Sequence, residues 1–260
     1  MTQVVIQAFQ EQDETVLEDA LVEFNELAEI EPNFFREAFK DIYTAIKPIV
    51  AYKEFANNAI RHQPLEFVVT MIERKPSLAK KDIELNKDIL ELIFQLMIDI
   101  DEDIDAEWLR PKEGFAGEEE EEDNVSYGKT CVDRLVAGVG ETAMLPLIGV
   151  LVQNTIANDT DWRYKHAGIM AFSQVGEYVD DIEKIRPMIP IVVQHIAHAN
   201  PKIRYASLHC IGQIADDMPG DFQKTFHAEC LPAMIQALDD ATPRVQSHAC
   251  ACFTNFCENT

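Results

Sequence analysis

The chain has 260 residues, and its 22 Lys and Arg are outnumbered by 46 Asp and Glu, which gives a net charge of −24. This charge argues against a general nucleic-acid binder, because such a protein needs a basic surface to neutralise phosphates. It favours basic protein partners, whose attraction to the chain weakens as salt rises. No run of 18 apolar residues is present, so we expect no membrane-spanning helix.

The first hundred residues predict a series of amphipathic helices, because apolar residues recur at three- and four-residue steps. Residues 2–9 look like part of one helix, and residues 14–30 carry a broad apolar face. Further helices are expected from Pro32 to about Pro48, over 52–74 and over 78–99. Pro64 should kink or divide the third of these. Glycine is scarce and strand-like alternation is weak, so we expect an all-α protein.

An acidic insertion over residues 100–123 interrupts this series. Between positions 99 and 123 there are 13 acidic and two basic residues, a net charge of −11. Such a segment repels itself and buries too little apolar surface to fold alone. By helix counting it joins the two helices of one pair, so we interpret it as an insertion into a repeat. It is either a solvated loop or an acidic arm that docks a basic partner, with Trp108 as an apolar anchor.

Two markers repeat at about 40 residues in the second half of the chain. The segments that begin at Tyr164, Ile203 and Val245 can be superposed, with offsets of 39 and 42 residues. A proline near the start of an apolar run precedes each segment, at Pro146, Pro190 and Pro232; proline suits the first turn of a helix. This period is typical of HEAT and armadillo arrays, in which helix pairs stack and share a core. We therefore predict a HEAT-repeat α-solenoid, a single array of about six repeats over residues 1–260.

Exposed polar positions also recur once per repeat on the second helices. They form an amide ladder of Gln174, Gln213 and Asn255, and three residues later an acid ladder of Glu177, Asp216 and Glu258. Amide side chains both donate and accept, so they can pair with the backbone of an extended peptide, while carboxylates can hold Lys or Arg. We expect a groove for an extended basic segment, although charged faces are ordinarily just solvated. Asp180, Asp181 and Asp217 add charge at the helix ends.

Neither a metal site, a cofactor nor catalysis is expected. The six cysteines lie in apolar helical patterns and lack the paired spacing of zinc fingers, which suits reduced thiols packed as small apolar residues. None of the phosphate-binding, dinucleotide-binding or hydrolase motifs is found.

The second half of the chain resembles the importin-beta superfamily, and within it the karyopherin beta-three, or importin-five, branch. The resemblance is carried by DWRYKHAG at 161–168 with Gly176-Glu177, PKIRYA at 201–206 with Gly212-Gln213, PGDFQK at 219–224 with His227, and RVQSHA at 244–249. It extends over about residues 124–260 and includes an acidic insertion in the preceding repeat.

This resemblance implies a nuclear import receptor that shuttles between cytoplasm and nucleus through the nuclear pore. Such receptors hold the basic localisation signals of their cargo proteins on a concave surface formed by the second helices, and nucleoporins are partners of the full-length proteins. Ran in its GTP form releases the cargo, and an acidic loop touches Ran in relatives. It implies cargo contacts for both ladders and a Ran or basic-partner contact for Glu118, Glu119, Glu120, Glu121, Glu122 and Asp123.

Family members are several times longer than this chain, so we expect a middle fragment of a receptor. The alternative is a generic HEAT-repeat scaffold that assembles folded proteins. A receptor predicts salt-sensitive binding of a short lysine-rich peptide, whereas a scaffold predicts no peptide preference.

Overall fold

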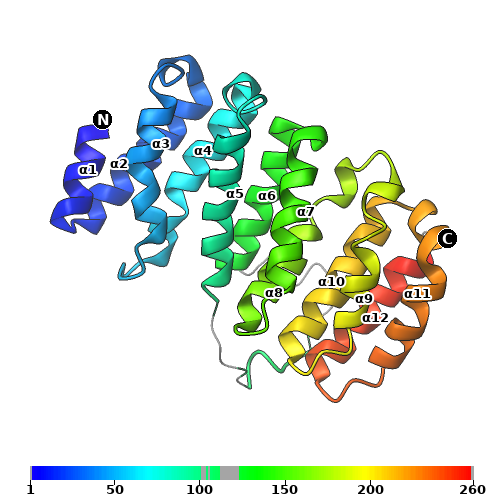
Figure 1. Ribbon diagram of the computed structural model, residues 1–260. Coiled ribbons are helices and arrows are strands. Elements are labelled where there is room, and N and C mark those ends of the chain that lie inside the picture. The colour runs from blue at the N-terminus through cyan, green and yellow to red at the C-terminus, as the bar shows by residue number, and fades with distance from the viewer. Residues whose placement is uncertain (1, 101–103, 105, 112–122, 259–260) are drawn as a thin grey trace. The chain divides into compact units, whose positions relative to one another are not determined.

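The structure is a computed structural model that describes residues 2–100, 104, 106–111 and 123–258 (Figure 1). Twelve α-helices and several 3₁₀ turns make up its ordered elements, and these described residues contain no strand. The all-α prediction is therefore confirmed. None of the helices in the described part of the chain is both long and apolar enough to cross a membrane.

The chain divides into two compact units. Unit 1 comprises residues 1–96 and 131–144, and unit 2 comprises residues 97–130 and 145–260. Unit 1 contains α1 (Thr2–Glu11), α2 (Glu14–Ile30), α3 (Phe39–Ala51), α4 (Gln63–Arg74) and most of α5 (Ile83–Ile98). Helices α6 (Asn124–Val139) and α7 (Glu141–Ile156) have residues in both units. Unit 2 contains α8 (Trp162–Phe172), α9 (Ile189–His195), α10 (Pro201–Asp217), α11 (Asp221–Ala237) and α12 (Pro243–Glu258).

Unit 1 is built from helix pairs around an aromatic core. Helix α2 packs against α1 and α4, and α3 packs against α1 and α4. Phe24 on α2, Phe35 and Phe67 on α4 are all buried, with ring centroids 5.1 to 5.6 Å apart. Burial of each such ring contributes about 2 kcal/mol, so this cluster fixes how the first two pairs stack.

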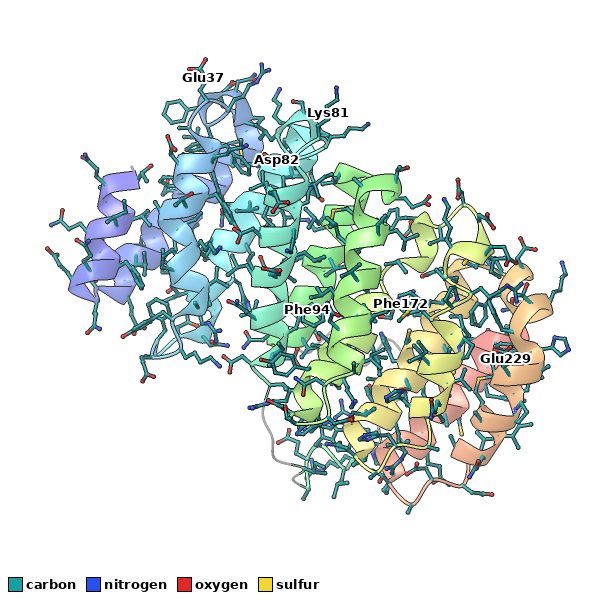
Figure 2. The ribbon with its side chains drawn as sticks, viewed as in Figure 1. Glu37, Lys81, Asp82, Phe94, Phe172 and Glu229 are labelled. Carbon is teal, nitrogen blue, oxygen red and sulfur yellow. The ribbon has the colours of Figure 1, made fainter. Side chains whose placement is uncertain are left out.

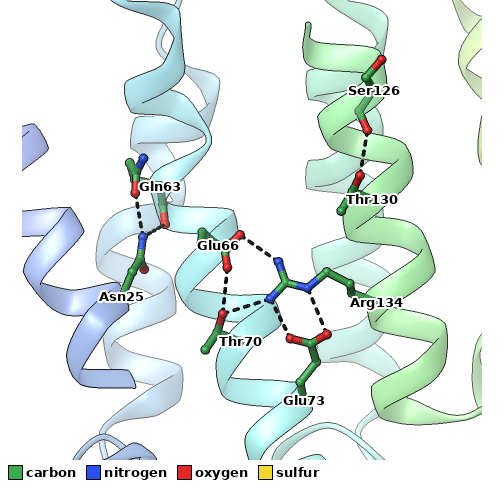
Figure 3. Close-up of polar contacts among 8 residues, drawn as sticks. All are labelled: Asn25, Gln63, Glu66, Thr70, Glu73, Ser126, Thr130 and Arg134. Carbon is green, nitrogen blue, oxygen red and sulfur yellow. Dashed lines mark hydrogen bonds and ion pairs between the residues drawn. The ribbon is translucent and has the colours of Figure 1, made fainter. Parts of the chain in front are cut away.

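Polar contacts also join neighbouring helices of unit 1 (Figure 3). The Asn25 amide donates to Gln63 Oε1 at 2.7 Å, which links α2 to the start of α4. Arg134 on α6 donates to both carboxylate oxygens of Glu73 at 3.0 and 2.6 Å and to Glu66 at 2.8 Å, and both partners lie on α4. Burial alone would lower the pKa of Arg134, but the hydrogen bonds to the two glutamates raise it above its usual value.

Unit 2 has its helices in two layers. Helix α10 packs against both α8 and α12, and we call α8, α10 and α12 the second-helix layer. Helices α9 and α11 contact each other and cover this layer from the other side. Phe222 on α11, which is fully buried, lies 6.1 Å from the ring of Phe256 on α12 and joins the two layers.

The structure confirms the sequence-based expectations for Pro64 and Pro190 and corrects those for Pro32, Pro146 and Pro232. Pro64 divides the expected helix over 52–74, because α4 begins at Gln63 and proline suits its first turn. Pro32 opens only a 3₁₀ turn, and α3 starts at Phe39 and continues past Pro48. Pro190 lies in the first turn of α9 as expected, but Pro146 and Pro232 lie inside α7 and α11. Those two helices start several residues earlier, so the helix-start explanation is wrong for them.

Candidate functional site

An acidic pocket of about 360 Å³ lies in unit 2, where the chain segments that follow α8 and α10 come together. Its lining includes five carboxylates: Glu177, Asp180, Asp181, Asp217 and Asp221. The volume is at the lower end of the range for small-ligand pockets, about 300 to 1,000 Å³. The pocket therefore offers room for one polar side chain among several negative charges.

Local backbone structure positions these carboxylates. After α8 ends at Phe172, a 3₁₀ turn over Gly176–Tyr178 carries Glu177 into the pocket wall. Asp217 is the last residue of α10, and Asp221 is the first residue of α11. The turn between them needs Gly220, whose φ of 81° lies in the left-handed region that favours glycine.

Gln223 fixes that turn from inside the protein. Its side-chain oxygen accepts from the Gly220 amide at 2.7 Å, and its side-chain nitrogen donates to the Ala215 carbonyl at 3.0 Å. Because Gln223 is buried, these bonds are protected from water, and the position of Asp221 relative to Asp217 is set by the fold.

Asp217 approaches the backbone of Gly176 unusually closely. A Cβ atom placed on Gly176 would lie 2.6 Å from Asp217 Oδ2 and 2.9 Å from Asp217 Cβ. The other carboxylate oxygen, Oδ1, accepts a hydrogen bond from the Gln213 amide at 2.8 Å. Asp217 is thus held between the turn after α8 and its own helix, and only glycine at position 176 leaves space for it.

The pocket carboxylates differ in whether a hydrogen bond or an ion pair offsets their negative charge. Asp180 forms an ion pair with Lys184 at 2.5 Å, and Asp181 accepts from the Glu183 amide at 3.0 Å. Glu177 and Asp221 make neither a hydrogen bond nor an ion pair within the described part of the chain, and both are exposed. Negative charges at short range repel one another, and a bound cation would relieve that repulsion.

The ladders were expected on the second helices, and this is wrong for their first rungs because α8 ends at Phe172. Gln213 and Asp216 are on α10, Asn255 and Glu258 are on α12, and Gln174 and Glu177 lie in the turns after α8. The three acid rungs Glu177, Asp216 and Glu258 are exposed, and the amide rungs Gln174, Gln213 and Asn255 are half-buried. Of these six residues only Glu177 lines the acidic pocket.

The structure defines hydrogen bonds of Gln213 and Gln174 within their own unit. Gln213 donates to Asp217, as described above, and Gln174 donates to Ser173 Oγ at 2.8 Å. Gln213 therefore orients a pocket carboxylate, a contact that spacing alone did not reveal. Asp221 was also missed from the sequence, although its place after the Pro219-Gly220 turn is a signal that could have identified it.

The acidic insertion is described only in part. Glu118 to Glu122 lie outside the described residues, whereas Asp123 is described and caps α6. Its side chain accepts from the Ser126 amide at 2.7 Å, and its carbonyl accepts from the Tyr127 amide at 3.0 Å. Asp123 thus satisfies otherwise unpaired donors at the helix start.

The cysteines of the described region behave mostly as core residues. Cys131, Cys210, Cys230 and Cys252 are buried, whereas Cys250 and Cys257 are exposed. Burial raises the pKa of Cys230 to about 12, so this thiol stays protonated and unreactive at neutral pH. Within the residues described, no group of three or more His, Cys, Asp or Glu side chains is arranged to hold a metal ion.

Comparisons with known proteins identify the repeats. A family model described as importin repeat matches residues 53–146, and one described as HEAT repeat matches residues 188–218. Importin subunit beta-3 of Saccharomyces cerevisiae is 30% identical over 239 residues, which cover 90% of this chain and 21% of that protein. The resemblance to the importin-beta superfamily is therefore confirmed.

Solved karyopherin structures show the same fold. The structure of Kap121p bound to RanGTP matches 98% of this chain and 25% of its own chain, with a TM-score of 0.85 and 25% identity. Kap121p bound to the extreme C-terminus of the protein phosphatase Cdc14p matches 96% of this chain and 25% of its own, with a TM-score of 0.84 and 25% identity. The HEAT-repeat solenoid fold is confirmed, and the chain spans about a fifth to a quarter of the length of these relatives.

Proposed function

We propose that this chain is part of a nuclear transport receptor and that unit 2 binds the basic localisation signals of cargo proteins. The observation that supports the proposal most directly is the acidic pocket, which gathers five carboxylates beside the amide and acid ladders. A related karyopherin has been solved with the extreme C-terminus of another protein, which is a chain segment rather than a folded surface. An extended basic segment is the ligand whose chemistry suits this combination of groups.

In this proposal one lysine or arginine side chain of the signal enters the acidic pocket. Glu177 and Asp221, which have no partner in the described part of the chain, supply the charge that meets it. Asp216 and Glu258 hold further basic side chains along the layer, and Asn255 faces the peptide backbone. Charge-assisted hydrogen bonds of this kind are about twice as strong as neutral ones, so a few of them can give a selective contact.

The remaining functions follow from the family resemblance. We propose that the full-length protein shuttles between cytoplasm and nucleus, contacts nucleoporins, and releases cargo when Ran binds in its GTP form. Glu118 to Asp123 remain the proposed contact for Ran or another basic partner. As a receptor it would act by binding and not by catalysis. The count of about six repeats in one array also remains a prediction.

The experiment is a titration of a fluorescently labelled lysine-rich peptide, followed by anisotropy at about 0.01 M and 0.1 M salt. The Debye length falls from about 30 Å to about 10 Å over this range, so binding by carboxylates should weaken clearly. Two variants test the site: the ladder variant Glu177→Gln/Asp216→Asn/Glu258→Gln and the pocket variant Asp180→Asn/Asp217→Asn/Asp221→Asn. Each should weaken binding about tenfold, since each removed contact contributes up to about 1 kcal/mol.

A matched control separates local contacts from net charge. Glu23→Gln/Glu37→Gln/Glu84→Gln removes the same three charges from exposed positions of unit 1, such as Glu37 in a loop (Figure 2). If this control weakens binding as much as the pocket variant, the peptide responds only to overall charge and the pocket assignment is wrong. If a variant that lacks residues 118–123 loses binding while the ladder and pocket variants keep it, the insertion is the contact. A scaffold would show no peptide preference at either salt.

A further inference from the structure

Two consecutive turns of unit 1 have the same local structure. One joins α2 to α3 over residues 31–38, and the other joins α4 to α5 over residues 75–82. Each contains a 3₁₀ turn that begins with a proline, at Pro32 and at Pro76. Because proline fixes the φ angle of the backbone, both turns are stiff for surface segments. A stiff segment loses little conformational freedom when a partner binds to it.

Two ion pairs hold these turns side by side. Arg74, the last residue of α4, pairs at 2.8 Å with Glu29, which lies near the end of α2. Lys40, near the start of α3, pairs with Asp82 in the second turn. Lys81, next to Asp82, projects outward at this edge of unit 1 (Figure 2). The two turns therefore present one common edge to the solvent.

Large apolar side chains are exposed along this edge. Ile30 is 79% exposed, Phe34 is 65% exposed and Ile83 is 61% exposed, the highest values among the large apolar side chains that the structure describes. Single exposed apolar residues are normal, but a cluster of them marks an interaction site. Phe34 is also held in place, since its ring lies 5.0 Å from that of Phe35 in the buried aromatic core.

Cations lie beside these apolar side chains. Residues 75–82 contain Lys75, Lys80, Lys81 and one aspartate, in a chain whose net charge is −24. Within the described part of the chain none of the three lysines forms an ion pair, whereas Asp82 is paired with Lys40. Lys80 and Lys81 are exposed, and Lys75 is half-buried. The second turn thus presents positive charge that no ion pair offsets.

Carboxylates near the edge lie outside the second turn. Glu31 and Glu37 belong to the first turn, and Glu84 lies on α5. All three are exposed, and Glu31 accepts a hydrogen bond from the Asn33 amide at 3.4 Å. The positive charge is therefore confined to residues 75–82, and the acidic part of a partner must face it there.

We propose that Ile30, Phe34 and Ile83, together with the three lysines, form a docking surface for an extended protein segment in which acidic residues flank one large apolar side chain. We call these six residues the turn-edge surface. The apolar side chain of the partner packs on the exposed apolar residues, and its carboxylates pair with the lysines. Charge complementarity decides the occupant, because a basic segment would be repelled by lysines that have no ion pair.

The turn-edge surface differs from the acidic pocket in both charge and ligand. The pocket lies in unit 2 and takes a basic side chain in the function proposed above, whereas this surface lies wholly in unit 1 and takes an acidic segment. The two ligands therefore do not compete for the same residues, and the turn-edge surface can be tested whether or not the pocket binds cargo.

The test measures the anisotropy of a fluorescein-labelled peptide, EDEFEDE, added to the 260-residue chain. The titration is made at about 0.1 M salt, where the Debye length of about 10 Å screens the more distant negative charges of the chain. Two control peptides separate the contributions: EDEAEDE lacks the large apolar side chain, and QNQFQNQ lacks the charges. Both should bind about tenfold more weakly than EDEFEDE, because each lacks one of the two kinds of contact.

The surface variants are Phe34→Ala and Lys80→Gln/Lys81→Gln. Each should weaken binding of EDEFEDE about five- to tenfold, since each removes part of the apolar or the charged contact. All of these side chains are exposed, so the variants should fold, which circular dichroism checks. If Phe34→Ala is not folded, Ile83→Ala removes another exposed apolar side chain of the same surface and should weaken binding in the same way.

Matched controls change the same chemistry elsewhere. Val150→Ala removes a side chain of α7 that is 60% exposed, and Lys87→Gln/Lys224→Gln removes two exposed lysines outside the turn. Both should bind EDEFEDE unchanged. Equal binding of EDEFEDE and QNQFQNQ, equal binding of EDEFEDE and EDEAEDE, no binding of EDEFEDE, or an equal loss in the surface and control variants would each overturn the proposal.

Discussion

Gly176→Ala is the smallest change that tests whether Asp217 must be held as the structure has it. The new Cβ would lie 2.6 Å from Asp217 Oδ2, so that oxygen must retreat by about 0.8 Å to reach ordinary contact at 3.4 Å. The Gln213 amide, 2.8 Å from the other carboxylate oxygen, resists this movement. We expect the free energy of unfolding to fall by about 2 kcal/mol, within the range for overpacking, because rotation of Asp217 cannot move its Cβ atom, 2.9 Å from the new Cβ, and the turn itself must shift.

The same movement displaces a carboxylate of the acidic pocket. We expect the lysine-rich peptide to bind about five- to tenfold more weakly, since about 1 kcal/mol of a charge contact is lost. The assay is the peptide titration at low salt, together with urea unfolding followed by circular dichroism. Asp217→Asn in the Gly176→Ala background should add little further loss, because both changes act on one carboxylate.

Gly149→Ala is the matched control. Gly149 lies in α7, and nothing is within 4 Å of the position its Cβ would take. Alanine is favoured over glycine in a helix by about 1 kcal/mol, so this variant should be slightly more stable and bind the peptide unchanged. If Gly176→Ala behaves like Gly149→Ala in both assays, the close approach of Asp217 has no consequence and the reasoning is wrong.

Three further predictions concern stability and thiol exposure. Arg134→Met should lower the free energy of unfolding, measured by urea denaturation, by about 2 kcal/mol. Glu66 and Glu73 are only about one-third exposed, and both would lose their ion pair with Arg134. A loss below about 0.5 kcal/mol would contradict this. Burial pushes the pKa of Asp240 up, but hydrogen bonds from Arg204 and the Thr242 amide hold it below its usual value. Asp240→Asn should therefore destabilise by about 2 kcal/mol above about pH 4, and the difference should vanish as pH falls through the lowered pKa, in unfolding curves measured from pH 7 to pH 2. A dithiobis-nitrobenzoate titration should label the exposed Cys250 and Cys257 in the native chain and all six cysteines in denaturant; fast labelling of Cys210 or Cys252 would mean that α10 and α12 open.

The helical part of the fold could be predicted because apolar periodicity is a local signal. The helices over 14–30 and 201–217 follow it closely, and Pro64 marks a real boundary. Local signals failed where tertiary packing decides. Pro146 and Pro232 lie inside helices, since apolar residues on both sides of each are buried in the core. The turns after α8 end that helix at Phe172, although the ladder positions Gln174 and Glu177 were expected to lie on it.

The candidate site was predictable only as a charge pattern. Spacing identified Glu177, Asp180, Asp181 and Asp217 as acidic positions near helix ends, but it could not reveal that they line one pocket. That requires the close approach of Gly176 to Asp217, which joins residues 41 positions apart. In the same way, the contact of Trp108 with Arg244 spans 136 positions. Contacts between residues so far apart depend on how the repeats stack. They produce no periodic pattern in the sequence from which they could be predicted.

In α10 and α12, the charged side chains at both helix ends have the sign that the helix dipole disfavours. Lys202 and Arg244 lie in first turns, which favour anions, and Asp216 and Glu258 lie in last turns, which favour cations. By the dipole rule alone, these four placements are unfavourable. The variant Glu177→Gln/Asp216→Asn/Glu258→Gln should therefore gain about 1 kcal/mol in free energy of unfolding at low salt, from relief of the unfavourable dipole contacts, while it loses lysine-rich peptide binding. A parallel loss of stability and binding would mean that the acid ladder is structural, and a gain in stability with unchanged binding would mean that the cargo lies elsewhere. Only opposite changes in the two quantities fit residues that are retained for a ligand at the expense of the fold.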